Sequence, residues 1–181
     1  KSEIRSINIT AEGEISEYLD SLQTFATVGV LAVSCGDEVN YVNANFIAKE
    51  KGIDLTTSEF SNHSGYQNKV SINITTPTGV KTISGTVFNE DVQRIVEING
   101  FPLDIEPKGK MIIMRNHDVP GVIGEVGKIL GNNNINIADF RLSRGKDGAL
   151  AVILIDEKAS SDVLKKLGNL EAAIAVAYAE I

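Results

Sequence analysis

Apolar residues recur with two different periods along the first hundred residues. Alternating apolar and polar positions are typical of half-buried strands, and apolar side chains three to four residues apart are typical of helices. Two helices are expected, at residues 19–33 and 40–52. Strands are expected at residues 4–9, 53–60, 70–74, 80–87, 94–98 and 101–105. The last two strands flank Asn99-Gly100, a strong hairpin signal. This half therefore predicts two helices packed against a mostly antiparallel sheet.

The remaining residues repeat the two periods in a different order. Strands are expected at residues 111–114, 135–142, 149–155 and 172–181. A helix over residues 120–130 follows the first strand, and a shorter helix follows the third. Ser160 or Ser161 should cap this shorter helix and Gly168 should end it. The order β-α-β-β-α-β is the ferredoxin-like layout, with both helices on one face of an antiparallel sheet.

A short turn-forming segment, Pro107-Lys108-Gly109, is the best candidate for a boundary between the two halves. It predicts an α+β chain of two small domains, residues 1–107 and 108–181. No repeat or low-complexity segment interrupts either half.

Residues 115–124 (RNHDVPGVIG) predict a strand, a polar loop and a helix start in succession. Pro120 suits the first turn of a helix, and Asp118 is placed to accept hydrogen bonds from the exposed N–H groups of that turn. Gly121 and Gly124 leave the backbone open to close approach. Such a loop suits a small molecule that carries a carboxylate, and it contains no nucleophile paired with a base. Capped helices that bind nothing are also common, so this loop alone leaves both interpretations open.

Composition narrows the possible functions. The 181 residues carry a net charge of −7, which disfavours nucleic-acid binding. One cysteine, Cys35, excludes an intrachain disulfide framework and is expected to be a buried thiol. No apolar stretch of about 18 residues is apparent and no signal-peptide pattern is present, so a cytoplasmic protein without a membrane partner is expected. Because Lys1 is not a start methionine, we expect a longer gene product.

Few other side chains form a recognisable site. His63 and His117 fall in separate loops without metal-binding spacing, so we expect no metal site. Residues 121–127 are rich in glycine but lack the GxGxxG spacing of a dinucleotide loop. Five cations could form an anion pocket near the domain boundary, or could simply be solvated. These are Arg94, Lys108, Lys110, Arg141 and Arg144.

Residues 117–144 (HDVPGVIGEVGKILGNNNINIADFRLSR), with the predicted β-α-β-β-α-β order, resemble the ACT domain, an amino-acid-binding regulatory module. The resemblance extends over residues 109–181. Upstream, EVNYVNANFIAKEKGIDL (38–55) and GTVFNEDVQRIVEINGFPLDIEPKGKMIIMRNHDVPGVIG (85–124) are similar to the C-terminal region of the long-form D-3-phosphoglycerate dehydrogenase family. In that family an allosteric substrate-binding domain directly precedes the ACT domain.

The resemblance implies a function that the composition alone does not indicate. It implies the regulatory part of an NAD-dependent oxidoreductase at the first step of L-serine biosynthesis, with catalytic and nucleotide-binding domains upstream. This fragment itself is expected to carry no catalytic residue and no cofactor. L-Serine would bind between paired ACT domains of a homo-oligomer, at positions that correspond to Asn116, Asp118 and Asn136. The first domain would bind a substrate-like anion, for which Arg94, Lys108 and Lys110 are the candidates.

Three alternatives remain open from the sequence. The chain could be a free-standing amino-acid sensor, the regulatory part of another amino-acid enzyme such as an L-serine dehydratase, or an ACT domain that only dimerises. Two positions depart from the family pattern: Asn116 stands where relatives often carry His or Tyr, and Val119 where Arg is common. Both positions bear on the identity of the effector.

Overall fold

A computed structural model describes residues 3–60, 65–89 and 91–181, and it divides into two compact units. The first unit spans residues 1–100 and the second residues 101–181. The segment proposed as a boundary from the sequence, Pro107-Lys108-Gly109, lies a few residues inside the second unit. His63 lies outside the described residues.

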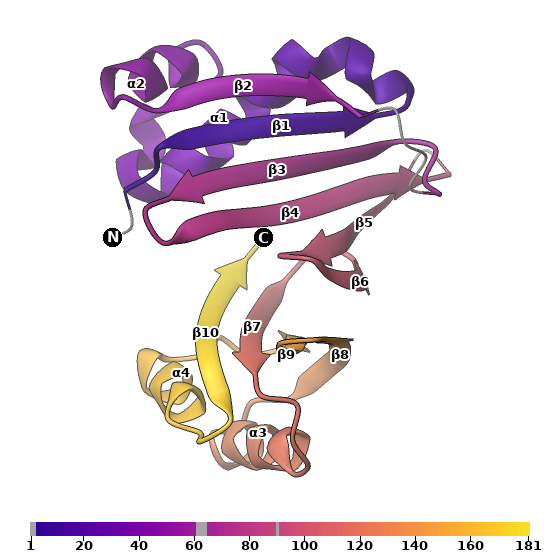
Figure 1. Ribbon diagram of the computed structural model, residues 1–181. Coiled ribbons are helices and arrows are strands. Elements are labelled where there is room, and N and C mark those ends of the chain that lie inside the picture. The colour runs from indigo at the N-terminus through magenta and orange to yellow at the C-terminus, as the bar shows by residue number, and fades with distance from the viewer. Residues whose placement is uncertain (1–2, 61–64, 90) are drawn as a thin grey trace. The chain divides into compact units, whose positions relative to one another are not determined.

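The first unit contains a mixed sheet in the strand order β2-β1-β3-β4-β5 (Figure 1). The strands are β1 (Ser6–Glu12), β2 (Asp54–Glu59), β3 (Lys69–Thr76), β4 (Gly79–Phe88) and β5 (Val92–Ile98). β1 and β2 are parallel, and the pairs β1–β3, β3–β4 and β4–β5 are antiparallel. Asn99 and Gly100, with φ of 51° and 81°, form the predicted turn after β5. The mostly antiparallel sheet is thus confirmed.

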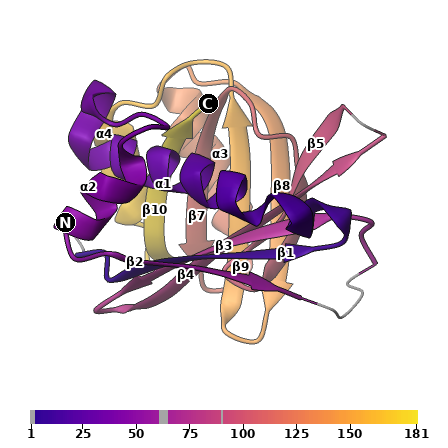
Figure 2. The same cartoon turned by 90° about the horizontal axis from the view of Figure 1, so that it is seen from above.

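The helices of this unit lie on one face of its sheet (Figures 1 and 2). They are α1 (Leu19–Cys35) and α2 (Ala44–Glu50), with 3-10 turns at Glu14–Tyr18 and Gly36–Glu38. Ile7 and Ile9 of β1 are fully buried with Leu31 of α1 in the unit's core. The core therefore forms where the apolar side of β1 meets α1.

Two helix predictions for this unit need correction. α2 begins four residues after Asn40, because the Asn40 side-chain oxygen accepts hydrogen bonds from the Val42 and Asn43 amides and holds a turn there.

The second correction concerns the helical stretch Glu14–Glu38. By length and composition this stretch is long and apolar enough to span a membrane, whereas no such stretch was expected from the sequence. Thr27 and Leu31 of this stretch are buried against the sheet of the unit.

The second unit has the predicted β-α-β-β-α-β order. After β6 (Phe101–Ile105) come β7 (Lys110–Asn116), α3 (Val122–Asn132), β8 (Ile137–Gly145), β9 (Gly148–Ile155), α4 (Ser161–Gly168) and β10 (Ala173–Glu180). The sheet order is β10-β7-β9-β8, and all neighbours are antiparallel. β8 is therefore an edge strand of this four-stranded sheet.

Both helices of the second unit pack on the same apolar face of its sheet. Ile112, Met114 and Ile153 are fully buried there, against Leu130 of α3 and Leu167 of α4. The predicted cap of α4 is confirmed, because Ser160 Oγ accepts a hydrogen bond from the Val163 amide at 3.3 Å. These contacts hold the β7–α3 connection at one end of the sheet.

Candidate functional site

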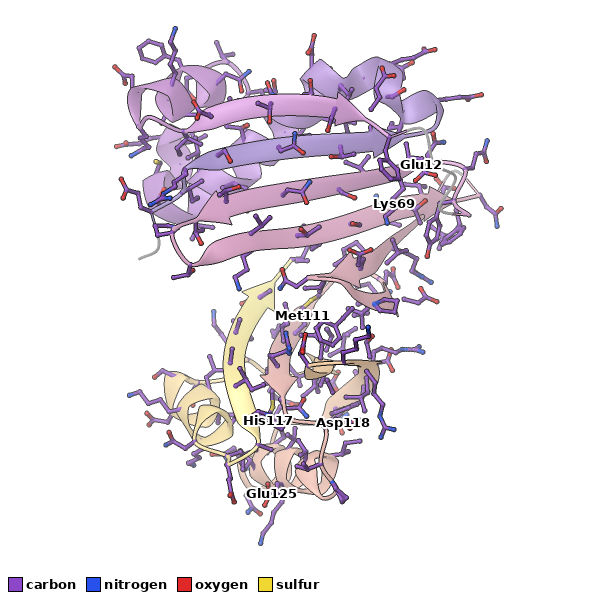
Figure 3. The ribbon with its side chains drawn as sticks, viewed as in Figure 1. Glu12, Lys69, Met111, His117, Asp118 and Glu125 are labelled. Atoms are coloured by element: carbon purple, nitrogen blue, oxygen red, sulfur yellow. The ribbon has the colours of Figure 1, made fainter. Side chains whose placement is uncertain are left out.

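A cavity of about 460 Å³ opens between the β7–α3 loop, the start of α3 and β8. Figure 3 labels His117 and Asp118 in this loop. Most of the lining is apolar and includes Met114, Val126 and Phe140. The polar side chains that line it are Asn116, Asp118 and Arg144. The cavity thus offers a small polar group of side chains within an apolar pocket, which is typical of small-molecule sites.

Asn116 is the most buried polar side chain of this cavity. It ends β7, is only 3% exposed, and donates a hydrogen bond from Nδ2 to the His117 carbonyl at 2.7 Å. Its Oδ1 is buried and has no hydrogen-bond partner among the described residues. An unsatisfied buried acceptor costs about 1–3 kcal/mol, so a ligand that donates a hydrogen bond to this oxygen would relieve that cost.

Asp118 does not cap α3, and this prediction was wrong. Its Oδ2 lies 3.3 Å from Nε of Arg144, a cation on β8. The helix begins at Val122 rather than at Pro120, and Gly121, with φ of 96°, occupies the cap position without a side-chain hydrogen bond. The ion pair draws the carboxylate toward β8 and away from the first helical turn.

The missing cap leaves the start of α3 available to a ligand. The Glu125 amide bonds to the Gly121 carbonyl at 3.0 Å, and the amides before it have no acceptor within the helix. Val122, Ile123 and Gly124 line the cavity. Helix N-terminal amides favour anions. The cavity therefore combines an anion-binding end with the acceptor oxygens of Asn116 and Asp118, a combination that suits an α-amino acid zwitterion.

Asn136 lies at the opposite end of the same sheet. It precedes β8, where Nδ2 donates to Asp156 Oδ2 at 2.6 Å and the backbone amide donates to Glu157 Oε2 at 2.7 Å. Asn116 pairs with Ala149 of β9, and Ile137, the neighbour of Asn136, pairs with Ile155. These two β9 positions are six residues apart, or about 20 Å at 3.3 Å per residue. A single chain therefore brings Asn116 and Asp118 together, but not Asn136.

The candidate anion residues each have a local contact. Arg94 donates to the Gln93 carbonyl at 3.1 Å, and Lys110 donates to the Asp156 carbonyl at 2.8 Å. Lys108 Nζ lies 2.6 Å from Glu106 Oε2. The anion site stays a prediction. If these cations bind phosphate, the double variant Arg94→Glu, Lys108→Glu should weaken phosphate binding measured by titration, and unchanged binding would argue against the assignment.

Arg144 is the site residue that the loop motif did not indicate. The sequence marks it only as one of five scattered cations, whereas its position in β8 places it at the cavity. Phe140, Leu142 and Arg144 alternate along β8, so all three face the helix side of the sheet. Counting in steps of two from Phe140 would have placed Arg144 on the helix side of the sheet, although not beside the loop. Over the part of the chain that the structure describes, no cluster of potential metal ligands appears.

Known proteins match nearly the whole chain. The family model of the D-3-phosphoglycerate dehydrogenase intervening domain matches residues 1–99, and the ACT domain model matches residues 110–172. The D-3-phosphoglycerate dehydrogenase of Bacillus subtilis is 35% identical over 97% of this chain, and that of Archaeoglobus fulgidus is 30% identical over 98%. The chain spans 34% of the length of each of these relatives.

Proposed function

Because the chain belongs to the D-3-phosphoglycerate dehydrogenase intervening-domain family and carries an ACT domain, we propose that it is the part of such an enzyme that binds L-serine for feedback control. The parent enzyme would oxidise 3-phosphoglycerate with NAD in the cytoplasm, at the first step of L-serine biosynthesis. Catalysis and NAD binding are assigned to the portion of the enzyme outside this chain. Serine would shift the equilibrium between a more active and a less active state of the enzyme. The size of that shift is set by the difference between its affinities for the two states.

One observation carries the amino-acid site: the buried Oδ1 of Asn116, which has no partner among the described residues and belongs to a residue that lines the cavity at the start of α3. The α-ammonium group of serine would donate to this oxygen and to the Asp118 carboxylate. The α-carboxylate would accept from the amides of the first turn of α3. Arg144 would stay paired with Asp118 or turn toward the carboxylate.

Pairing of two chains through β8 would supply Asn136. β8 is an edge strand, and its backbone can pair with a second copy. In an antiparallel pair centred on Phe140, residue 136 of one chain lies opposite residue 144 of the other. Because Arg144 lines the cavity, Asn136 of the partner subunit would reach its mouth. Its side-chain amide offers two donors and one acceptor to the ligand.

Association through this edge is expected to depend on Leu142, which is 36% exposed on β8. Leu142→Glu would place one carboxylate from each copy within an apolar contact and should halve the mass of the assembly measured by light scattering. Leu142→Met keeps the volume and apolar character and should leave the mass unchanged. An unchanged mass in Leu142→Glu would place the contact elsewhere.

Calorimetric titration tests the ligand. L-Serine should bind with a saturable heat, and Asn116→Ala should weaken binding about 5- to 150-fold, which corresponds to roughly 1–3 kcal/mol. Asn132→Ala makes the same change at an exposed position near the end of α3 and should bind serine normally. Equal affinities of both variants would remove Asn116 from the site.

The same titration separates the alternatives. Saturable binding of a different amino acid, with the same loss in Asn116→Ala, would support an ACT site whose effector is not serine. No binding of any of the twenty amino acids would support an ACT domain that only dimerises.

A further inference from the structure

Helix α1 of the first unit is apolar on nearly all sides, although only one side is buried by its own sheet. Thr27 and Leu31 face the core. On the outer side, Phe25 is 57% exposed and Val33 is 87% exposed. The most apolar 18-residue window of this helical stretch is only 11% buried. Helices that are apolar all round are normally covered on all sides, so the outer side of α1 lacks a covering partner among the described residues of this unit.

A groove of about 800 Å³ runs beside the exposed side of α1. Its walls come from α1 and from the helix-facing side of β3, including Val70, Ile72 and Ile74. The α1 residues that line it include Phe25, Gly29 and Val33. The exposed stripe and the groove thus form one continuous apolar surface.

We propose that this surface binds α1 of a second copy of the chain, with the two helices antiparallel and crossing at Gly29. Residues 25, 29 and 33 follow one another at intervals of four, so they share one face of the helix. Two antiparallel copies that cross at residue 29 place Phe25 of one chain opposite Val33 of the other, twice by symmetry. Such an isologous contact closes on itself.

Gly29 allows the two helices to approach closely. A Cβ at this position would meet nothing within 4 Å in the single chain, so the space above Gly29 is open. Small residues at a crossing point let helix backbones come together. The groove beside Gly29 then receives side chains of the second helix.

Charge favours a second copy as the occupant. The chain carries a net charge of −7, yet Asp20 is the single charged residue between Leu19 and Cys35. Two identical acidic chains repel each other over most of their surfaces, and the α1 stripe lets two copies meet without placing like charges in contact. The uncharged stripe also offers no group to attract a basic partner.

The exposed aromatic area is consistent with a stable contact. Phe25 meets Tyr41, which is 62% exposed, edge to face with ring centroids 4.9 Å apart. At about 200 Å² per fully buried aromatic side chain, these two would bury roughly 240 Å² of the ~800 Å² that each partner contributes to a stable interface. Val33 and the groove walls extend the area.

Cysteine cross-linking tests the crossing point directly. In a Cys35→Ser background, Gly29→Cys should form a disulfide-linked dimer in high yield under a mild oxidant. Ser21→Cys on the same helix is the matched control. It lies eight residues, about 12 Å, from the crossing point, and would be about 24 Å from its partner copy, too far for a disulfide.

A second substitution tests the apolar contact. Val33→Glu adds a charge at a site that is 87% exposed, so the fold should be kept, as circular dichroism would show. It should lower the yield of the Gly29→Cys cross-link at least tenfold, whereas Leu142→Glu on the ACT edge should leave that yield unchanged. Equal cross-linking at positions 21 and 29, or no effect of Val33→Glu, would overturn the proposal. Binding of the unsubstituted chain to neutral lipid vesicles with no cross-link at position 29 would also overturn it.

Discussion

Substitution of Gly148 by alanine is expected to destabilise the ACT domain by roughly 2–4 kcal/mol and to abolish serine binding. Gly148 begins β9 with φ of 114°, a conformation that L-residues with side chains rarely adopt. A Cβ there would lie 2.5 Å from the Asn116 carbonyl oxygen and 3.6 Å from His117 Cα. Because these are backbone atoms at the end of β7 and the start of the β7–α3 loop, the backbone itself would have to move there. Urea unfolding followed by circular dichroism, together with serine titration, measures both effects.

Two other glycines separate the causes of this loss. Gly121 also has a positive φ, of 96°, but an added Cβ would meet nothing within 4 Å, so Gly121→Ala should show the backbone strain alone, about 1–2 kcal/mol. Gly124 lies inside α3 in open space, so Gly124→Ala should be neutral or stabilising by up to about 1 kcal/mol. If Gly148→Ala were no worse than Gly121→Ala, close contact with the loop would not be the cause.

The sequence predicted the second unit well because its signals are local. The continuous apolar run of residues 149–155 and the Ser160 cap each depend on neighbours within a few positions, and both the strand and the cap are present in the structure. The order of elements then leaves few ways to cover one apolar face. In the first unit, α2 began later than predicted because two asparagine side chains compete with the helix for backbone amides.

The candidate site was predicted less completely because its side chains meet through long-range contacts. Asp118 was assigned as a helix cap from its position in the loop, but Arg144, 26 residues later, competes for the carboxylate. No local pattern reports that a strand distant in sequence will place a cation beside a loop. The unpartnered oxygen of Asn116 is likewise visible only once its burial is known.

The position of Asn136 explains why the family resemblance and the fold of a single chain give different sets of residues for the serine site. The resemblance groups Asn136 with Asn116 and Asp118, whereas the fold of one chain holds it about 20 Å away, across six residues of β9. Both descriptions agree if the site is shared between two chains joined at β8. A site shared between two chains predicts that mixed dimers of two different variants regain serine binding, which a site within one chain does not predict.

Mixed dimers of Asn116→Ala and Asn136→Ala chains are expected to recover half of the serine sites that both homodimers lose. In the mixed dimer, one site combines the altered loop with the altered Asn136 position and is lost. The other site combines an intact Asn116 with an intact Asn136 of the partner subunit and binds serine normally. If both residues came from one chain, each site of the mixed dimer would carry one substitution, and no binding would return.

Co-expression of the two variants with different affinity tags in a Val33→Glu background, which removes the proposed α1 contact, followed by sequential purification, isolates the mixed dimer joined at β8 for calorimetric titration. The expected stoichiometry is one serine per two chains with the affinity of the unsubstituted protein, because an intact site has lost none of its contacts.

Mixed dimers in which one chain carries both substitutions provide the matched control. Each of their sites contains one altered residue if the site is shared, so they should bind serine weakly. If the site lies within one chain, the unsubstituted chain keeps an intact site and the control binds normally. The two mixtures therefore give opposite results under the two arrangements, and the pair assigns Asn136 to one chain or the other without a structure of the complex.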